Sequence, residues 1–277
     1  MKRDRNHRIE LKSKREIGLM RQAGLAVWQA HAIAKKMMRP GIATVEIDRA
    51  VEAYFSKRGA EPLFKDYPNS VQGKPAFPAV TCMSVNDAVV HGIPDERPLV
   101  EGDIVSIDTG CRLNGWCGDA ALTHAIGTVN PEIQKLLDVT QGVLALAIEL
   151  LASKGRWSQV ADEMAQYVLD AGFSTVECFV GHGIGREMHE DPQVPNFRGQ
   201  SLSGSSDFAI EEGLVIAIEP MVNAGSKRVK MCRDQWTQVT ADGKCSAHFE
   251  HTVAITENGP VALTAAPSED EAAQLPQ

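Results

Sequence analysis

The spacing of apolar residues along the chain predicts four helices, over residues 13–38, 44–59, 131–155 and 158–172. In the first helix Ser13 stands at the expected N-cap with Glu16 three residues later, which is the signature of a capping box. Pro131 fits the first turn of the third helix, and the second is expected to run from a Thr44 cap to a stop at Gly59. The chain therefore contains two pairs of amphipathic helices.

The second and fourth helices resemble each other. At an offset of 113 residues their apolar positions and terminal glycines coincide: Ile47 with Val160, Val51 with Met164, Tyr54 with Tyr167 and Gly59 with Gly172. Each follows a longer helix and precedes a segment rich in strand formers. This weak echo indicates two similar halves with a cleft between them.

Strand-like runs follow each helix pair, over residues 103–111, 116–129, 212–223 and 247–256. The first two flank the sequence Leu113-Asn114-Gly115, which is typical of a hairpin turn. Because no long linker separates the halves, we predict one α+β domain rather than two.

The predicted hairpin brings two aspartates together. If Asn114 and Gly115 form a two-residue turn, Asp108 pairs opposite Ala121. Asp119 then lies two places along on the same face, because strand side chains alternate. Another even-numbered loop would set the two aspartates directly opposite, and an odd loop would need a bulge. Like charges on one face repel and favour a bound cation; the alternative is that one aspartate faces solvent.

Three further residues extend this pair to a candidate metal site. Glu219 follows four apolar residues and precedes Pro220, so we expect its carboxylate at a partly buried strand end. Glu250 has a similar setting, although either glutamate alone is compatible with a structural ion pair. His182, in a glycine-rich segment, adds an imidazole, the commonest protein metal ligand. Four carboxylates and one imidazole suit two divalent ions (Co, Mn, Fe(II) or Zn) at ~3.5–4 Å separation.

Composition and charge place few limits on this picture. The 277 residues are 43% hydrophobic and 23% charged, which is ordinary for a globular protein. The most apolar run, residues 143–152, is short and contains a glutamate, and the charged N-terminus lacks an apolar core. We therefore expect no membrane span and no secretory signal, a cytoplasmic location, and six reduced cysteines.

The two ends of the chain differ in charge from its body. Residues 1–15 hold seven Lys/Arg and two Asp/Glu, a balance of +5 in a chain whose net charge is −8. We expect residues 1–14 to form a basic arm, and residues 264–277 to form a mobile acidic tail. Ribosome contact through the arm is a hypothesis; we expect no specific nucleic-acid target, no membrane partner and a monomer.

Six short blocks resemble the signatures of type I methionine aminopeptidases. They are SVNDAVVHGIP, GDIVSIDTG, GWCGDA, GHGIGREMHEDP, AIEPM and HFEHTVAIT. The resemblance extends over residues 15–263 and implies one catalytic domain with the pita-bread fold, in which two pseudosymmetric α/β halves surround a dinuclear metal site. It also implies removal of the initiator methionine from nascent proteins and peptides whose second residue is small.

The resemblance further implies residue roles. The implied metal ligands are Asp108, Asp119, His182, Glu219 and Glu250. Asp119 and Glu250 would bridge the two ions, and Glu219 would transfer the proton of the attacking water. His91 and His189 would contact the substrate and act in catalysis, so the two histidines of the glycine-rich segment would have different tasks.

The resemblance also predicts the pocket for the methionine side chain. Phe77, Cys82 and Trp236 match positions that line this pocket in the family. The chain departs from the family at Met188, where many relatives carry Phe, and at Ala120, where Ser or Thr is usual. We expect Met188 to change the shape of the pocket, and Ala120 to remove a hydroxyl near the metals.

Three alternatives share parts of this pattern. Prolidases and Xaa-Pro aminopeptidases use the same five ligands but usually carry a large additional N-terminal domain, and only 90 residues precede His91 here. Type II methionine aminopeptidases carry an insertion for which there is little room. A non-catalytic pita-bread module that binds a protein partner has typically lost ligands, whereas all five are present.

Overall fold

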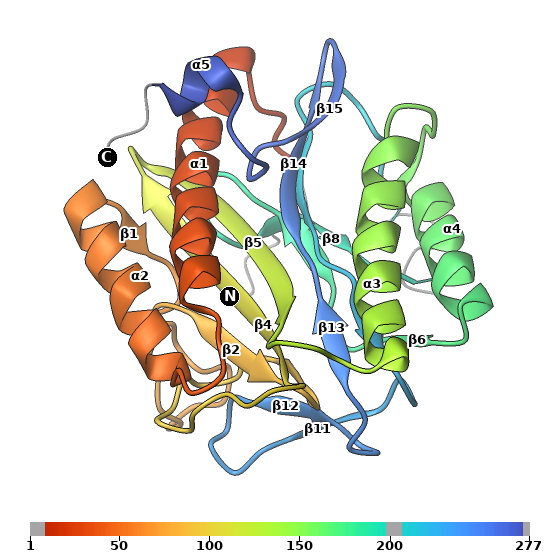
Figure 1. Cartoon of the computed structure of the whole chain (residues 1–277). Helices are drawn as coiled ribbons and strands as arrows, with labels where there is room; N and C mark the ends of the chain where they lie inside the picture. Colours follow the sequence, from red (N-terminus) through yellow and green to blue (C-terminus); the bar gives the residue numbers. More distant parts are fainter. Residues whose placement is uncertain (1–8, 198–206, 274–277) are drawn as a thin grey trace.

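The computed structural model describes residues 9–197 and 207–273, and its helices lie close to the predicted ranges (Figure 1). They are α1 (Lys14–Met37), α2 (Thr44–Arg58), α3 (Pro131–Leu150), α4 (Trp157–Asp170) and the short α5 (Glu269–Ala272). The capping box of α1 is confirmed, because the Ser13 side chain accepts from the Glu16 amide and the Glu16 carboxylate accepts from the Ser13 amide. Gly59 ends α2 in the left-handed conformation, as predicted.

Two predicted helix starts were wrong by one residue. The N-cap of α2 is Ala43, whose amide donates to Glu46 at 2.9 Å, while the Thr44 hydroxyl is engaged by the backbone of Asp95. Helix α4 begins at Trp157 rather than at Ser158. Both differences arise because the hydroxyl is hydrogen-bonded to a partner distant in sequence; for Ser158 that partner is the Asp207 carboxylate.

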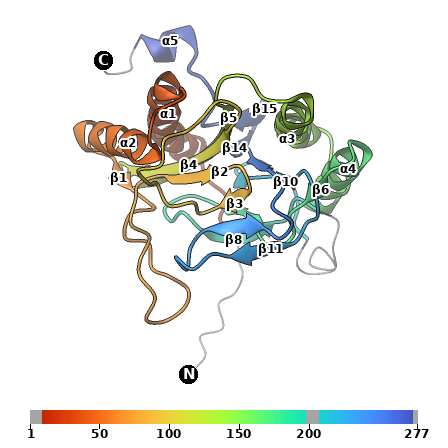
Figure 2. The same cartoon turned by 60° about the horizontal axis from the view of Figure 1, so that its bottom comes forward.

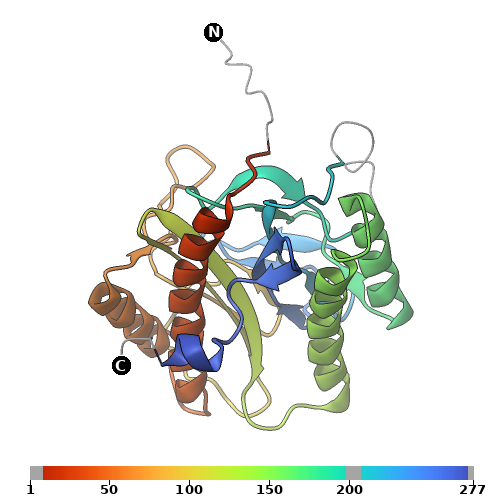
Figure 3. The ribbon, with the colours of Figure 1, turned by 90° about the horizontal axis from the view of Figure 1, so that it is seen from above.

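The helices lie on one side of the sheets (Figures 2 and 3). Helices α1 and α2 cover the hairpin of β4 (Ile104–Leu113) and β5 (Trp116–Ala125), and Val27, Ile47 and Ile107 are fully buried between them. Helices α3 and α4 cover the other half over a separate core. One helix pair on each half agrees with the predicted similarity of the second and fourth helices.

The β4–β5 hairpin has the predicted register. Leu113 pairs with Trp116 across a two-residue turn, and Asp108 lies opposite Ala121. Asn114 and Gly115 both have positive φ, 53° and 79°, which is the backbone of a primed turn that asparagine and glycine tolerate. The sheet of this half also contains β1 (Glu61–Pro62) and β2 (Cys82–Val85), both paired with β4.

Three further sheets build the other half and the pocket rim, which confirms the α+β class. The largest has the order β15 (Gly259–Ala262), β14 (His251–Thr256), β9 (Val215–Ile218), β7 (Gly181–Gly183) and β8 (Glu190–Val194). A second has the order β13 (Ser246–His248), β10 (Met221–Asn223) and β6 (Ser174–Thr175). The third has the order β11 (Val229–Met231), β12 (Gln238–Thr240) and β3 (Ala88–Val90).

Parts of both predicted terminal segments contact the body. The Lys12 amide donates to the Gly213 carbonyl at 2.7 Å, so the described end of the basic arm is attached; residues 1–8 lie outside the described residues. Arg21 of α1 donates to the carbonyls of Leu263 and Ala265 and pairs with Glu271 of α5. The mobility of the acidic tail in solution stays a prediction. Among the described residues, no helix has the length and apolarity to cross a membrane.

Candidate active site

The β4–β5 hairpin presents both aspartates to one face. Gly110 lies opposite Asp119 and Ala121 lies opposite Asp108, so the two carboxylates are two places apart on the same side. Thr252 of β14 holds Asp119 in place, because its hydroxyl accepts from the Asp119 amide at 3.1 Å and donates to the Asp119 carbonyl at 2.9 Å. The strand pairing thus makes Asp119 a rigid part of the site.

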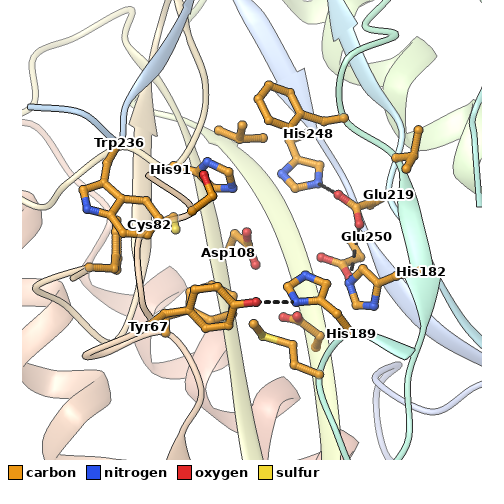
Figure 4. A pocket seen from close by; sticks show the side chains of 18 of the residues that line it. Tyr67, Cys82, His91, Asp108, His182, His189, Glu219, Trp236, His248 and Glu250 are labelled. Atoms are coloured by element: carbon orange, nitrogen blue, oxygen red, sulfur yellow. Dashed lines mark hydrogen bonds and ion pairs between the residues drawn. The ribbon is translucent and has the colours of Figure 1, made fainter. Parts of the chain in front are cut away.

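The two glutamates occupy breaks between consecutive strands. Glu219 separates β9 from β10, and Glu250 separates β13 from β14. The Glu250 amide donates to the Ala121 carbonyl at 2.7 Å, and the Glu219 carbonyl accepts from the Asn196 side chain at 3.1 Å. Each break frees the backbone from the sheet and aims a carboxylate at the hairpin (Figure 4).

His182 comes from β7, next to β9. A side chain at Gly183 would meet the Asp191 carbonyl oxygen at 2.1 Å, so glycine allows β7 and β8 to approach. The His182 Nδ1 lies 2.9 Å from the Gly183 carbonyl oxygen, and its Nε2 lies 3.6 Å from Glu219 Oε1. This geometry leaves Nε2 directed at the carboxylates.

Burial makes the charges of this cluster unfavourable without a cation. It raises the pKa of Asp119 to about 7, and together with the Asp119 and Glu219 charges it raises the pKa values of Asp108 and Glu250 well above the usual range. Burial likewise lowers the pKa of His182 to about 3, so the imidazole is neutral and free to act as a ligand.

The residues present fit a divalent metal centre. Ligand atoms of Asp119, His182 and Glu250 all lie within 4.8 Å of one another. One carboxylate oxygen each of Asp108, Asp119 and Glu250 is buried without a hydrogen-bond partner. Unpaired buried oxygens of this kind are rare unless a cation binds them.

An apolar cavity of about 300 Å³ adjoins the cluster. The predicted pocket residues meet there: Phe77, Cys82 and Met188 form a buried cluster, and Trp236 packs against it. The Phe77 and Trp236 rings lie edge to face with centroids 5.3 Å apart, and His91 lies 6.3 Å from the Trp236 ring. The cavity therefore has a soft apolar end and a charged end.

Ala120 does not lie where the sequence analysis expected it. It belongs to the buried cluster beneath α1 and α2, because its side chain points away from the face that carries Asp119. A hydroxyl at this position would lie in the helix-covered core, so the expected loss of a hydroxyl near the metals was wrong.

His189 lies between the ligand cluster and the pocket. Its ring centroid is 4.3 Å from that of His182, and its Nδ1 lies 2.9 Å from the Tyr67 hydroxyl (Figure 4). Tyr67 is one of the lining residues that the sequence analysis missed; Phe64, Phe179 and His248 are among the others. The Nε2 of His248 is buried without a hydrogen-bond partner. His248 lies two residues before Glu250 in the HFEH block, and this closeness in sequence could have indicated it.

Comparison with known proteins identifies the family. Residues 18–257 match the model of metallopeptidase family M24. The chain is 49% identical over 256 residues to a methionine aminopeptidase of Clostridium perfringens, covering 92% of this chain and 98% of the relative. The chain belongs to the methionine aminopeptidases. A Bacillus subtilis member is 46% identical, covering 91% of this chain and 97% of that relative.

Solved structures confirm the pita-bread fold of this methionine aminopeptidase. The structure of the Thermotoga maritima enzyme superposes with a TM-score of 0.86 at 39% identity, covering 94% of this chain and 100% of that one. A prolidase from Pyrococcus furiosus reaches 0.71 at 23% identity, and its match covers 66% of that longer chain. The prolidase likeness shows the shared fold alone.

Proposed function

We propose that this methionine aminopeptidase removes the initiator methionine from nascent proteins and peptides whose second residue is small. The observation that carries the proposal is an apolar pocket whose inner end meets a buried cluster of four carboxylates and one imidazole. Aromatic, thiol and thioether groups at Phe77, Cys82 and Met188 suit an unbranched thioether side chain. The crowding by His189 and the ligands beside the scissile bond favours a small second residue.

The proposed ligands are Asp108, Asp119, His182, Glu219 and Glu250, with two divalent ions per chain. Asp119 and Glu250 are proposed as the bridging ligands, which is supported by their closeness to each other and to His182. Divalent cations in such a site supply Lewis acidity and make hydroxide available near neutral pH. The donor set suits Co, Mn, Fe(II) or Zn.

The side chains divide the remaining chemistry. Glu219 is proposed to accept the proton of the attacking water and to pass it to the leaving amine, since its carboxylate faces the pocket from the strand break. His189 is proposed to donate to the developing oxyanion, with the Tyr67 hydroxyl holding its other nitrogen. His91, whose pKa burial lowers to about 4, is proposed to contact the scissile amide as a neutral imidazole.

The test is kcat/KM for three peptides with metal-reconstituted enzyme. Met-Ala-Ser should be cleaved far faster than Met-Leu-Ser, and Ala-Pro peptides should be nearly inert. A peptide with norleucine in place of methionine should have a kcat/KM lower by only ~10- to 200-fold, since one altered group in an apolar pocket contributes ~1–3 kcal/mol. Preference for Ala-Pro would indicate a prolidase, and no cleavage with any of the four metals would favour a non-catalytic module.

We propose that the basic arm assists encounter with nascent chains at the polyanionic ribosome, as part of a monomeric cytoplasmic enzyme. Deletion of residues 1–8 should weaken ribosome co-sedimentation at low salt without changing the hydrolysis of free peptides. This deletion keeps Lys12 and the Ser13 cap, which the structure shows attached to the body. Unchanged co-sedimentation would contradict the proposal.

A further inference from the structure

A buried lysine outside the pocket is not explained by the proposed chemistry. The Lys12 side chain is 2% exposed, and its Nζ lies 2.8 Å from Glu190 Oε2. Glu10 adds a second oxygen at 3.6 Å, but its side chain is 68% exposed. Because burying an ammonium group costs several kcal/mol unless it is paired, Glu190 is the partner that allows Lys12 to be buried.

Glu190 also organises the segment that carries His189. Its Oε1 accepts from the backbone amides of Arg186 at 2.8 Å and Glu187 at 3.1 Å. Those two residues form the turn immediately before Met188 and His189. One carboxylate therefore joins the lysine before α1 to the turn that enters the pocket, and Figure 3 shows the start of α1 near β8, the strand that Glu190 begins.

Close packing makes this connection stiff. A side chain at Gly185 would lie 2.6 Å from Lys12 Cε and 2.7 Å from both Glu190 oxygens, so the glycine leaves room for the ion pair. The Gly185 carbonyl accepts from the Cys117 amide at 2.8 Å, which attaches the turn to β5. The turn is thus held at the hairpin and at the Lys12–Glu190 pair.

The His189 ring has edge-to-face contacts with the rings of His182 and Tyr67, at centroid distances of 4.3 and 5.7 Å, but it is not enclosed. Its side chain is exposed, and its one hydrogen-bond partner in the described structure, Tyr67, is 37% exposed. The position of its ring therefore depends on the backbone that carries it. We propose that Lys12 is a positioning residue that acts through Glu190 to place His189 in the pocket. This inference rests on the proposed role of His189 in catalysis.

The first test compares Lys12→Met with Lys14→Met. Lys14 is the matched control, because it lies two residues away and pairs with Glu257 in an exposed contact of 2.6 Å. Lys12→Met should lower kcat by ~10- to 100-fold with a smaller change in KM, as expected when a catalytic group is displaced by ~1 Å. Lys14→Met should stay within ~2-fold of the parent enzyme. Equal kcat in the two variants would overturn the inference.

The second test repeats Lys12→Met in a His189→Ala background. If Lys12 acts through His189, the lysine change should alter kcat by less than ~2-fold there, because the two effects belong to one unit. The same fold loss in both backgrounds would show that Lys12 acts elsewhere and would overturn the inference alone. An unchanged kcat for His189→Ala by itself would overturn the proposed role of His189 and the inference with it.

A variant of the other partner and a structural readout cover the case in which Lys12→Met folds poorly. Glu190→Gln removes the ion pair but keeps an oxygen that accepts from the two turn amides. In both variants hydrogen exchange of the Arg186 and Glu187 amides should be faster than in Lys14→Met. Unchanged exchange at these amides in Glu190→Gln, together with parental kcat, would overturn the inference.

Discussion

At the scale of single residues, Asp119 is the electrostatic centre of the site. Its charge is among the causes that raise the pKa values of Asp108, Glu219 and Glu250, after burial itself. Its backbone is fixed on both sides by Thr252. Because Asp119 acts on every other carboxylate of the cluster, its substitution should weaken metal binding at the whole site.

Asp119→Asn should therefore remove most of the activity, by ~10²-fold or more, since an amide cannot supply the negative charge that holds the cations. The number of divalent ions per chain, measured by elemental analysis after dialysis against buffered metal, should fall as well. Asn114→Asp, an exposed change in the hairpin turn, is a suitable control for a single carboxamide–carboxylate exchange. Full activity of Asp119→Asn would contradict the proposed ligand set.

Substitution of the two histidines of the glycine-rich segment should affect the metal content of the protein differently. His182→Ala should lose both metal and activity, because His182 Nε2 faces the carboxylate cluster. His189→Ala should lower kcat strongly, by ~10²-fold, while metal content stays near that of the parent, because its Nδ1 is directed to Tyr67. Equal metal loss in the two variants would contradict the different roles.

At the scale of secondary-structure elements, Arg21 joins α1 to the C-terminal segment. Its guanidinium donates to the Leu263 and Ala265 carbonyls at 2.7 and 2.9 Å, and to the Glu271 carboxylate at 2.8 Å. The contact with Arg21 lowers the pKa of Glu271 to about 2. The arginine thus attaches α5 and the segment after β15 to the first helix.

Arg21→Met should lower the free energy of unfolding by ~1 kcal/mol, because the Glu271 side chain is 33% exposed and solvent screens part of its pairing. The part that comes from Glu271 is complete above its unfolded pKa and is lost as the pH falls toward 2, since the folded state lowers this pKa. Urea unfolding at pH 7 and at pH 4 measures both quantities. Arg49→Met, which removes an exposed pair with Glu96, should change stability less.

At the scale of the whole molecule, the proposed metal centre lies where the two halves meet. Asp108 and Asp119 come from the hairpin beneath α1 and α2, whereas Glu219 and Glu250 come from the sheets beneath α3 (Figure 1). Metal ions bound between them would neutralise charge that the fold otherwise buries. Loss of the metal should then lower the stability of the complete chain more than loss of a metal from a surface site would.

Removal of metal by a chelator should lower the melting temperature, and added Mn, Co or Zn should restore it in a concentration-dependent way. The metal-free protein should also lose stability as the pH rises from about 4 to 7, because burial raises the folded pKa of Asp119 to about 7, above its unfolded value. Calorimetry of the stripped and reloaded protein between pH 5 and 8 tests both. A melting temperature independent of metal would contradict a site between the halves.

Local chemistry in the sequence was enough to predict the four long helices, the β4–β5 hairpin and one half of the site, but not short strands such as β1 and β6. Ser13 and Glu16 cap α1 through neighbours three residues apart, and the Asn114-Gly115 turn sets the register that puts Asp108 and Asp119 on one face. These features depend on contacts that close within a few residues, so the order of residue types determines them. The settings of Glu219, Glu250 and His182 in the sequence also made them candidate ligands. The bridging, proton-transfer and substrate roles were available only through resemblance to a family.

Only the tertiary structure determined which distant residues meet. Strand pairing joins His182 to Ala217, which are 35 residues apart, and His251 to Ile218, which are 33 residues apart. Nothing in local periodicity indicates those pairs. Tyr67 reaches His189 across 122 residues, and Lys12 reaches Glu190 across 178. The sequence around a tyrosine or a lysine can be the same whether its side chain faces solvent or a buried partner. The burial that decides between these outcomes exists only once the two halves have packed.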